Sequence, residues 1–205
     1  MAAQPSVSGA AAQIRDRILD AAAATLSAGG FADSRLITSI ARIAGLSRPT
    51  LYKHGGDLDE IKAALLHRET ERFFDVVRTS IAGASWTTDD IVDVLVTIID
   101  HARRHELMQS ALRDAPEVVL PWFTTRADVV IAMSKAHVGP VLRAAIEAGE
   151  MPAVDVDVLV DVLTRVVLSL VFTAGTVDAD DPDAVRAYLR AVVGMWTMAS
   201  APSPA

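Results

Sequence analysis

Side chains that can donate hydrogen bonds are concentrated in one short stretch near the N-terminus. Between positions 47 and 54 they are Ser47, Arg48, Thr50, Tyr52, Lys53 and His54. Arg48 can bind a guanine edge or a phosphate, and Thr50 can touch a base or the methyl group of thymine. Tyr52, Lys53 and His54 are better placed to bind phosphates near the end of the helix. The stretch has the chemistry of a helix that reads double-stranded DNA, although an ordinary solvated helix face carries similar residues.

Two histidines, His101 and His105, are four residues apart, a spacing that two metal ligands on one helix face can use. No acidic residue occupies a further matching position on that face, and the sequence has no His-Glu-x-x-His run. We therefore expect a polar helix face or a pocket wall, with neither a metal nor a cofactor. A nucleophile elbow, a phosphate-binding loop and a dinucleotide fingerprint are also absent from the sequence, so an enzyme is the least supported class.

The segment 36–52 must position the donors of the first stretch. The apolar residues at helical spacing in its first half are Ile37, Ile40, Ala41 and Ile43. Gly45 can end this first helix in the left-handed conformation, and Ser47 can cap a second helix. Leu46 and Leu51 are expected in the core. Helix, glycine turn and capped helix are the layout of a helix-turn-helix, but an ordinary helical hairpin has the same spacing.

Residues 36–61, which end in TLYKHGGDLDEI, resemble the DNA-binding domain of tetracycline-repressor-like (TetR) family regulators. That family has an apolar helix, a glycine turn and a Ser/Thr-rich recognition helix ending in a Leu-Tyr-x-His or Leu-Tyr-x-Tyr pattern. The resemblance implies that the second helix enters the major groove of double-stranded operator DNA. The residues expected to contact DNA are Arg35, Thr38, Ser47, Arg48, Pro49, Thr50, Tyr52, Lys53 and His54.

Two departures from the family pattern keep a second interpretation open. A Gly55-Gly56 pair follows the tyrosine pattern, and Leu58 replaces the lysine that commonly clamps a phosphate. The paired glycines are expected to loosen the hinge before the next helix. The alternative to a regulator is therefore a helical ligand-binding or interaction module that has lost DNA binding.

The sequence predicts helices throughout, so the expected fold class is all-α. Residues 1–10 are expected to be a disordered tail, and 11–56 a helix-turn-helix domain with its first helix at 11–28. Gly29-Gly30 should end that helix, and Asp33 or Ser34 should cap the next one. A connecting helix at 57–82 should begin with Asp57 and Glu60 as a capping box. Residues 83–205 are expected to form a larger helical domain, with helices at about 88–104, 106–114, 121–148, 155–174 and 182–199.

Apolar residues on the last two of these helices exceed what one neighbouring helix can cover. We expect them to pair with a second copy of the chain in a four-helix bundle, and the resemblance implies the same homodimer. The residues expected at this interface are Leu159, Leu163, Val166, Leu170, Leu189, Val192 and Trp196.

Large side chains in the middle helices most often fill cores. Because the TetR family encloses a ligand cavity in this region, the resemblance implies that a small apolar or aromatic effector binds there. Such an effector would release a repressor from its operator. The residues expected to contact it are Trp86, His101, His105, Met108, Trp122, Phe123, Met133 and Phe172.

The formal net charge of −7 hides an uneven distribution. Residues 1–54 hold 6 Lys and Arg against 3 Asp, whereas the remaining residues hold 13 basic against 23 acidic ones. The N-terminal end therefore has an excess of 3 positive charges and the remainder an excess of 10 negative ones. This asymmetry is expected of a protein that presents one end to phosphates.

Several sequence features bear on the cellular location. The chain has no cysteine, and its first residues lack the basic region and long apolar core of a signal peptide. The most apolar run, 156–175, is interrupted by Asp157, Asp161 and Arg165, so a buried or interface helix is expected there instead of a membrane span. We expect a cytoplasmic protein.

Overall fold

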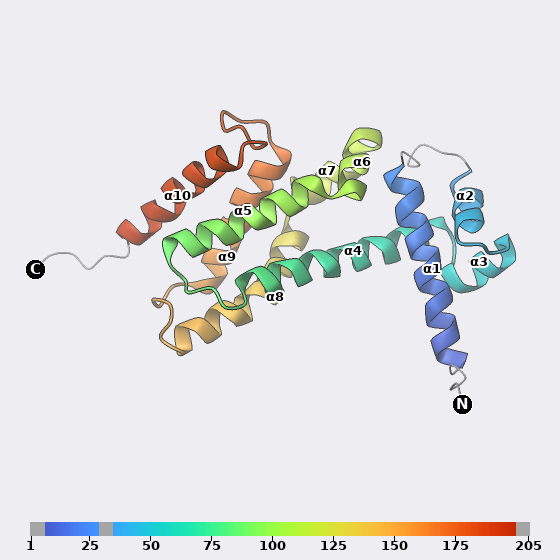
Figure 1. Ribbon diagram of the computed structural model, residues 1–205, viewed down its shortest axis with the longest axis horizontal. Helices are drawn as coiled ribbons and strands as arrows, with labels where there is room; N and C mark the ends of the chain where they lie inside the picture. Colours follow the sequence, from blue (N-terminus) through green and yellow to red (C-terminus); the bar gives the residue numbers. More distant parts are fainter. Residues whose placement is uncertain (1–6, 29–34, 200–205) are drawn as a thin grey trace, which may run out of the picture. The chain divides into compact units, whose positions relative to one another are not determined.

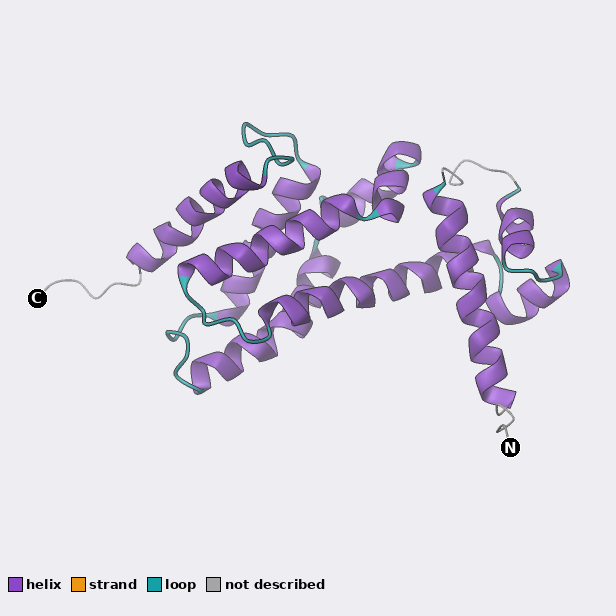
Figure 2. Ribbon diagram, in the orientation of Figure 1, coloured by secondary structure: helices purple, strands orange, loops and turns teal. Residues whose placement is uncertain are grey.

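The computed structural model describes residues 7–28 and 35–199, and every regular element in them is a helix (Figure 1, Figure 2). This confirms the all-α prediction. The helices are α1 (Val7–Ser27), α2 (Leu36–Ile43), α3 (Arg48–Gly55), α4 (Leu58–Ile81), α5 (Thr88–Arg104), α6 (Glu106–Asp114), α7 (Pro116–Phe123), α8 (Asp128–Glu147), α9 (Val156–Phe172) and α10 (Pro182–Ala199). Gly29-Gly30, Asp33 and Ser34, to which the sequence assigned a helix end and a cap, lie outside the described residues.

The chain divides into two compact units. Unit 1 comprises residues 1–72 and 105–119, and unit 2 comprises residues 73–104 and 120–205. Helix α4 thus contributes its first part to unit 1 and its last part to unit 2, and α6 belongs to unit 1. This grouping differs from the expected division, which placed everything after residue 82 in one C-terminal domain. The difference arises because α6 packs against α1.

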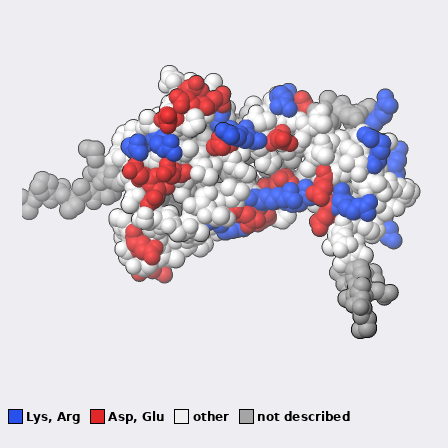
Figure 3. All heavy atoms as spheres, in the orientation of Figure 1, with Lys and Arg blue, Asp and Glu red and all other residues white. Residues whose placement is uncertain are grey.

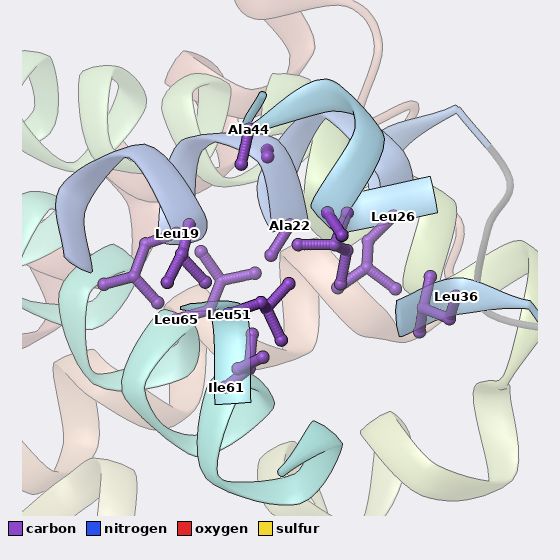
Figure 4. Packing of buried hydrophobic residues seen from close by; sticks show 12 residues of the cluster. Leu19, Ala22, Leu26, Leu36, Ala44, Leu51, Ile61 and Leu65 are labelled. Carbon is purple, nitrogen blue, oxygen red and sulfur yellow. The ribbon is translucent and has the colours of Figure 1, made fainter. Parts of the chain in front are cut away.

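The core of unit 1 is formed by apolar faces of α1, α2, α3 and the beginning of α4 (Figure 4). On α1, Ile18, Ala22 and Leu26 are buried at a spacing of four residues, so they form one apolar stripe on the helix. Helix α6 adds Leu107 to this cluster. Its Ser110 hydroxyl donates a hydrogen bond of 2.7 Å to the Leu26 carbonyl oxygen, so α6 is fixed to the end of α1.

Unit 2 is built from pairs of packed helices (Figure 1). Helix α8 packs along α9, and α5 packs against both α9 and α10. Two ion pairs link α5 to α10, with 2.9 Å between Arg186 Nη2 and Asp93 Oδ1 and 2.8 Å between Arg190 Nη2 and Asp89 Oδ1. Exposed pairs of this kind contribute about 0–1 kcal/mol each, so the apolar contacts between the helices dominate the stability of this unit.

Two predicted boundaries were wrong. Helix α1 begins at Val7, so residues 7–10 are helical and do not belong to a disordered tail. The alanine-rich sequence after Gly9 favours extension of the helix in this direction. The expected helix at 121–148 is instead two helices, α7 and α8, separated by residues 124–127. Pro121 lies inside α7, and after Phe123 the chain leaves the helix in a turn in which the Arg126 N–H donates to the Pro121 carbonyl oxygen at 2.7 Å.

The junction between α3 and α4 explains the glycine pair. Gly55 is buried, and a Cβ placed there would lie 3.1 Å from Ile18 Cγ2. Gly56 has φ 82° and ψ −157°, a region that is essentially restricted to glycine. The capping box then forms as predicted, with Asp57 N donating to Glu60 Oε2 at 2.9 Å and Glu60 N donating to Asp57 Oδ1 at 2.8 Å. Both glycines thus meet definite steric requirements.

We expect Gly56→Ala to lower the free energy of unfolding by about 2–4 kcal/mol, from backbone strain and a disrupted capping box. The reason is that an added Cβ would lie 2.1 Å from Glu60 Oε2. Gly83→Ala is the matched control, because Gly83 also has φ 82° but has nothing within 4 Å of an added Cβ. Urea unfolding should show a loss of only about 1–2 kcal/mol for the control. Equal losses would mean that the contact with Glu60 has no effect.

Candidate nucleic-acid interface

The turn between α2 and α3 has the geometry of a Schellman motif. Gly45 has φ 63°, its N–H donates to the Arg42 carbonyl at 3.2 Å, and the Leu46 N–H donates to the Ala41 carbonyl at 2.9 Å. Leu46 packs against the core of unit 1. Gly45 therefore ends α2 as predicted, and Leu46 fixes the turn against the core.

The start of α3 is capped by Ser47, as predicted. The Thr50 N–H donates to Ser47 Oγ at 3.2 Å, and Pro49 lies in the first turn, where a missing N–H does no harm. The hydroxyl oxygens of Ser47 and Thr50 are 2.8 Å apart and share a hydrogen bond. Because its hydroxyl is engaged in this cap, Thr50 offers its methyl group more readily than its oxygen to a base.

Helix α3 separates a buried side from an exposed one. Leu51 is completely buried in the core of unit 1, whereas Tyr52 is 46% exposed and Arg48 and Lys53 are also exposed. The other residues expected to contact DNA lie in the same unit: Arg35, Thr38, Ser47 and Pro49 are exposed, and Thr50 and His54 are half-buried. Lys and Arg side chains lie over α2 and α3 on the face shown in Figure 3.

One apolar residue was misplaced by the sequence pattern. Ile43 was expected on the core side of the first helix, but it is 45% exposed, and Leu36 occupies the core instead. Helical spacing places Ile43 near the side of Leu36 and Ile40, but Ile43 is the last residue of α2, where the chain turns through Ala44 and Gly45, so the spacing alone does not ensure that it is covered. Leu58, the residue that departs from the family pattern, packs partly against the core of unit 1, so its apolar character has a structural reason.

The two spaced histidines do not share a helix face. Helix α5 ends at Arg104, and His105 is the N-cap of α6, with its Nδ1 accepting the Met108 N–H at 3.3 Å. His105 Nε2 lies 3.6 Å from Glu69 Oε2 in unit 1. His101 belongs to unit 2, where its ring centroid is 6.0 Å from that of Phe73. The predicted common face was wrong because a helix boundary falls between the two residues.

The other residues expected at an effector site are found in several different environments. Trp86 packs against an apolar cluster of α8 and α9, and Met133 against a separate cluster around Phe74. The rings of Phe123 and Phe172 stack with centroids 4.3 Å apart, and Arg126 lies over the exposed ring of Trp122. Met108 is in unit 1. The structure therefore does not bring the expected set together around one cavity.

The surface hollows of the described part of unit 2 include one of about 100 Å³ and one of about 430 Å³. The larger one is lined by Arg103, Phe172 and the loop that follows α9. Of the residues expected to contact an effector, only Phe172 lines either hollow. The sequence missed Arg103, whose guanidinium pairs with Asp180 Oδ1 at 2.5 Å, because no local motif marks it.

Several residues expected at a dimer interface are buried inside the chain itself. Leu159, Leu170 and Leu189 belong to the apolar clusters of unit 2, and Leu163 and Val166 pack against those clusters. Val192 is half-buried, and the side chain of Trp196 lies outside the described residues. This is a correction to the expected interface, because Leu159, Leu170 and Leu189 form part of the core of unit 2.

Other residues on the same two helices form their outer faces. Val158 and Val162 of α9 are 54% and 38% exposed, and Tyr188 and Met195 of α10 are 42% and 65% exposed. Beside Val162, Asp161 accepts a hydrogen bond of 2.8 Å from Arg165. That hydrogen bond lowers the pKa of Asp161 and raises the pKa of Arg165, so the pair remains charged at neutral pH.

A helix-turn-helix in one unit and a helical second unit define the fold. The fold is that of TetR-family regulators. One similar solved structure is the TetR family repressor AlkX from Dietzia sp. strain DQ12-45-1b, implicated in biodegradation of n-alkanes; it is 20% identical, with a TM-score of 0.61 over 90% of this chain and 95% of that chain. The repressor QsdR from R. erythropolis is also 20% identical, with a TM-score of 0.55 over 88% of this chain and 95% of that chain. A TetR-family regulator from Pectobacterium atrosepticum is 17% identical, with a TM-score of 0.64 over 96% of this chain and 98% of that chain. No family model matches the sequence, and no curated protein matches it.

Among the described residues, α8 is long and apolar enough to cross a membrane, with a mean hydropathy of 1.4 in its most apolar window. The core helix of a folded domain meets the same criterion. Ile131, Leu142 and Ala145 of α8 are buried, and the helix packs along α9. Of the apolar window of α8, 28% is buried inside the chain.

Proposed function

We propose that the protein is a DNA-binding transcription regulator, and specifically a repressor. The observation that carries this proposal is the geometry of α3. Leu51 anchors the helix inward and Ser47 caps its start, while Arg48, Tyr52 and Lys53 point away from the core. Two observations support the same function. Solved repressors share the fold, and residues 1–54 of this chain carry an excess of positive charge. A regulator of this kind acts where the chromosome is, so we also propose a cytoplasmic location.

The decisive experiment selects operator sequences with the purified protein and then measures binding of two variants. Arg48→Ala should cost about 1–3 kcal/mol of binding free energy and relax the preference at one base pair, because an arginine at a base edge carries sequence information. Lys53→Ala should weaken binding to all sequences alike and reduce the salt slope by about 1, because it would remove a phosphate contact.

Arg126→Ala provides a control, because Arg126 belongs to unit 2 and its loss removes the same charge from the chain. If Arg48→Ala and Lys53→Ala both bind the selected operator like the parent protein, α3 is not the reading helix. If the parent protein selects no sequence, the module without DNA binding becomes the better interpretation.

We propose that the regulator acts as a homodimer through the outer faces of α9 and α10. Val158 and Val162 lie one helical turn apart, and Tyr188 and Met195 lie two turns apart, so each helix presents an apolar strip. Exposed apolar strips on two helices suit a four-helix bundle with a second copy. A two-fold dimer can place two reading helices about 34–36 Å apart, one turn of DNA.

We further propose that a small apolar or aromatic molecule releases the regulator from DNA. The hollow beside Phe172 and Arg103, of about 430 Å³, is of a size that ligand sites commonly have. The coupling must be reciprocal: if the ligand lowers the affinity of the protein for its operator, the operator lowers the affinity of the protein for the ligand by the same factor. A coupling of about 1–3 kcal/mol is typical.

The test is calorimetric titration of a compound found by thermal-shift screening, with the protein free and bound to its operator. We expect the dissociation constant of the compound to rise about 5–150-fold when operator is present, which corresponds to that coupling. Phe172→Ala should weaken the compound if it binds in the larger hollow, whereas Trp86→Ala should not. An unchanged dissociation constant in the presence of operator would show that the compound is not the effector.

A further inference from the structure

Two consecutive residues of α1 contact the helix-turn-helix at two different points. Arg17 Nη2 donates a hydrogen bond to the carbonyl oxygen of Ala44, the C-cap of α2. Ile18 is completely buried, and its Cγ2 lies 3.1 Å from the position of a Cβ at Gly55, the last residue of α3. Helix α1 therefore contacts the chain immediately before the turn and again at the end of the reading helix.

The hydrogen bond from Arg17 supplies a partner for a carbonyl group at the end of α2. The last four carbonyl groups of a helix have no partner inside it. In α2 and its cap, the turn supplies N–H groups to the carbonyls of Ala41 and Arg42, and Arg17 supplies a charged donor to that of Ala44. A positive charge at a helix C-terminus is also favourable to the helix dipole. Arg17 is thus part of the turn although it lies 27 residues away in sequence.

The turn is closely fitted around this guanidinium. A Cβ added at Gly45 would lie 3.3 Å from Arg17 Nη2, so the backbone of the turn and the side chain of Arg17 are in near contact. Gly45 is followed directly by Leu46 and the cap of α3. A shift of the turn would consequently change the direction in which the exposed face of α3 points.

We infer that Arg17 is a positioning residue, which holds the turn between α2 and α3 and thereby orients the reading helix. This inference rests on the proposed function of α3. Its rival is a direct role, in which the exposed Arg17 binds a DNA phosphate. The two roles differ in measurable ways, because a phosphate contact releases counterions and contributes to the salt dependence of binding, whereas a contact inside the protein does not.

The chain offers a matched control in Arg15. It lies on the same helix two residues earlier, and it is also exposed. Arg15→Met and Arg17→Met remove the same charge and keep a long apolar side chain. Any difference between the two variants therefore reports the contact with Ala44 and not the change in net charge.

The first measurement is amide hydrogen exchange without DNA. In Arg17→Met, the amides of Gly45 and Leu46 should exchange at least about 10-fold faster, because the turn loses a fixed partner. The amide of Leu51 should keep its protection, which shows that the core of unit 1 is folded. Arg15→Met should match the parent protein at all three amides. Equal loss of protection at Gly45, Leu46 and Leu51 would indicate general destabilisation and would overturn the inference.

The second measurement is binding to the selected operator over a series of salt concentrations. Arg17→Met should lose about 10-fold in affinity, with the slope of log K against log salt unchanged and a relaxed base preference. A slope reduced by about 1 would identify Arg17 as a phosphate contact and overturn the inference, as would parent-like binding. If the parent protein selects no operator, the proposed function fails, and the exchange data alone decide whether Arg17 holds the turn.

Discussion

Replacing Val162 and Met195 with glutamate in the same chain is expected to convert the proposed dimer into a monomer. Both side chains are exposed, at 38% and 65%, so the substitutions place charges on the outer faces of α9 and α10 without entering the core. Two charges facing their own copies across a two-fold axis would be both desolvated and repelled. Light scattering should give the mass of one chain for the double variant and the mass of two chains for the parent protein.

The loss of dimerisation should have a large effect on DNA binding. A monomer binds only one half-site of the operator. It therefore loses the increase in affinity, about 10²–10⁴-fold, that comes from linking two DNA-binding units in one dimer. Leu66→Glu is the control, because Leu66 is 55% exposed on the part of α4 that belongs to unit 1. That variant should remain a dimer. If the double variant is still a dimer, α9 and α10 do not form the interface, and a monomeric parent protein would contradict the proposal as a whole.

Leu51→Ala is expected to destabilise unit 1 by about 2–5 kcal/mol, the usual range for a buried leucine. Leu51 is completely buried and lies among side chains from α1, α2 and α4, so little can move to fill the space it leaves (Figure 4). It is also the inward anchor of α3. Operator binding should therefore fail at a temperature at which unit 2 is still folded.

The measurement is urea unfolding followed by the exchange of amides in each unit. Leu66→Ala makes the same chemical change at an exposed position of unit 1, and we expect a change within about 0.5 kcal/mol. If both substitutions lower the free energy of unfolding equally, the burial of Leu51 does not contribute to the stability of unit 1. If Leu51→Ala is destabilised but binds its operator normally, α3 does not depend on this anchor.

The sequence predicted the features that depend on neighbouring residues. Gly45 with a positive φ, Ser47 as a cap, and Asp57 with Glu60 as a capping box are set by contacts within a few positions of the chain. Such contacts leave a readable signature because the residue types and the spacing are both constrained. The reading helix could for this reason be delimited before the structure was known.

The errors concern contacts between distant parts of the chain. An apolar stripe on a helix shows that one side is covered, but not whether the cover comes from the same chain or from a second copy. Leu159, Leu170 and Leu189 were for that reason assigned to a dimer interface, although they pack within unit 2. Arg17 likewise carries no local signal, because its partner Ala44 is reached only after folding.

The position of α6 has a consequence for how the protein is made. Ser110 bonds to Leu26 across 84 positions of sequence, so unit 1 cannot be completed until residues 105–119 have left the ribosome. At about 5–20 residues per second, the synthesis of residues 73–119, which follow the first segment of unit 1, takes roughly 2–9 s. During that interval the side of α1 that later receives α6 is uncovered. A fragment that stops at residue 82 would retain the reading helix but keep this side permanently open, and residues 1–119 are the shortest N-terminal piece that contains all of unit 1.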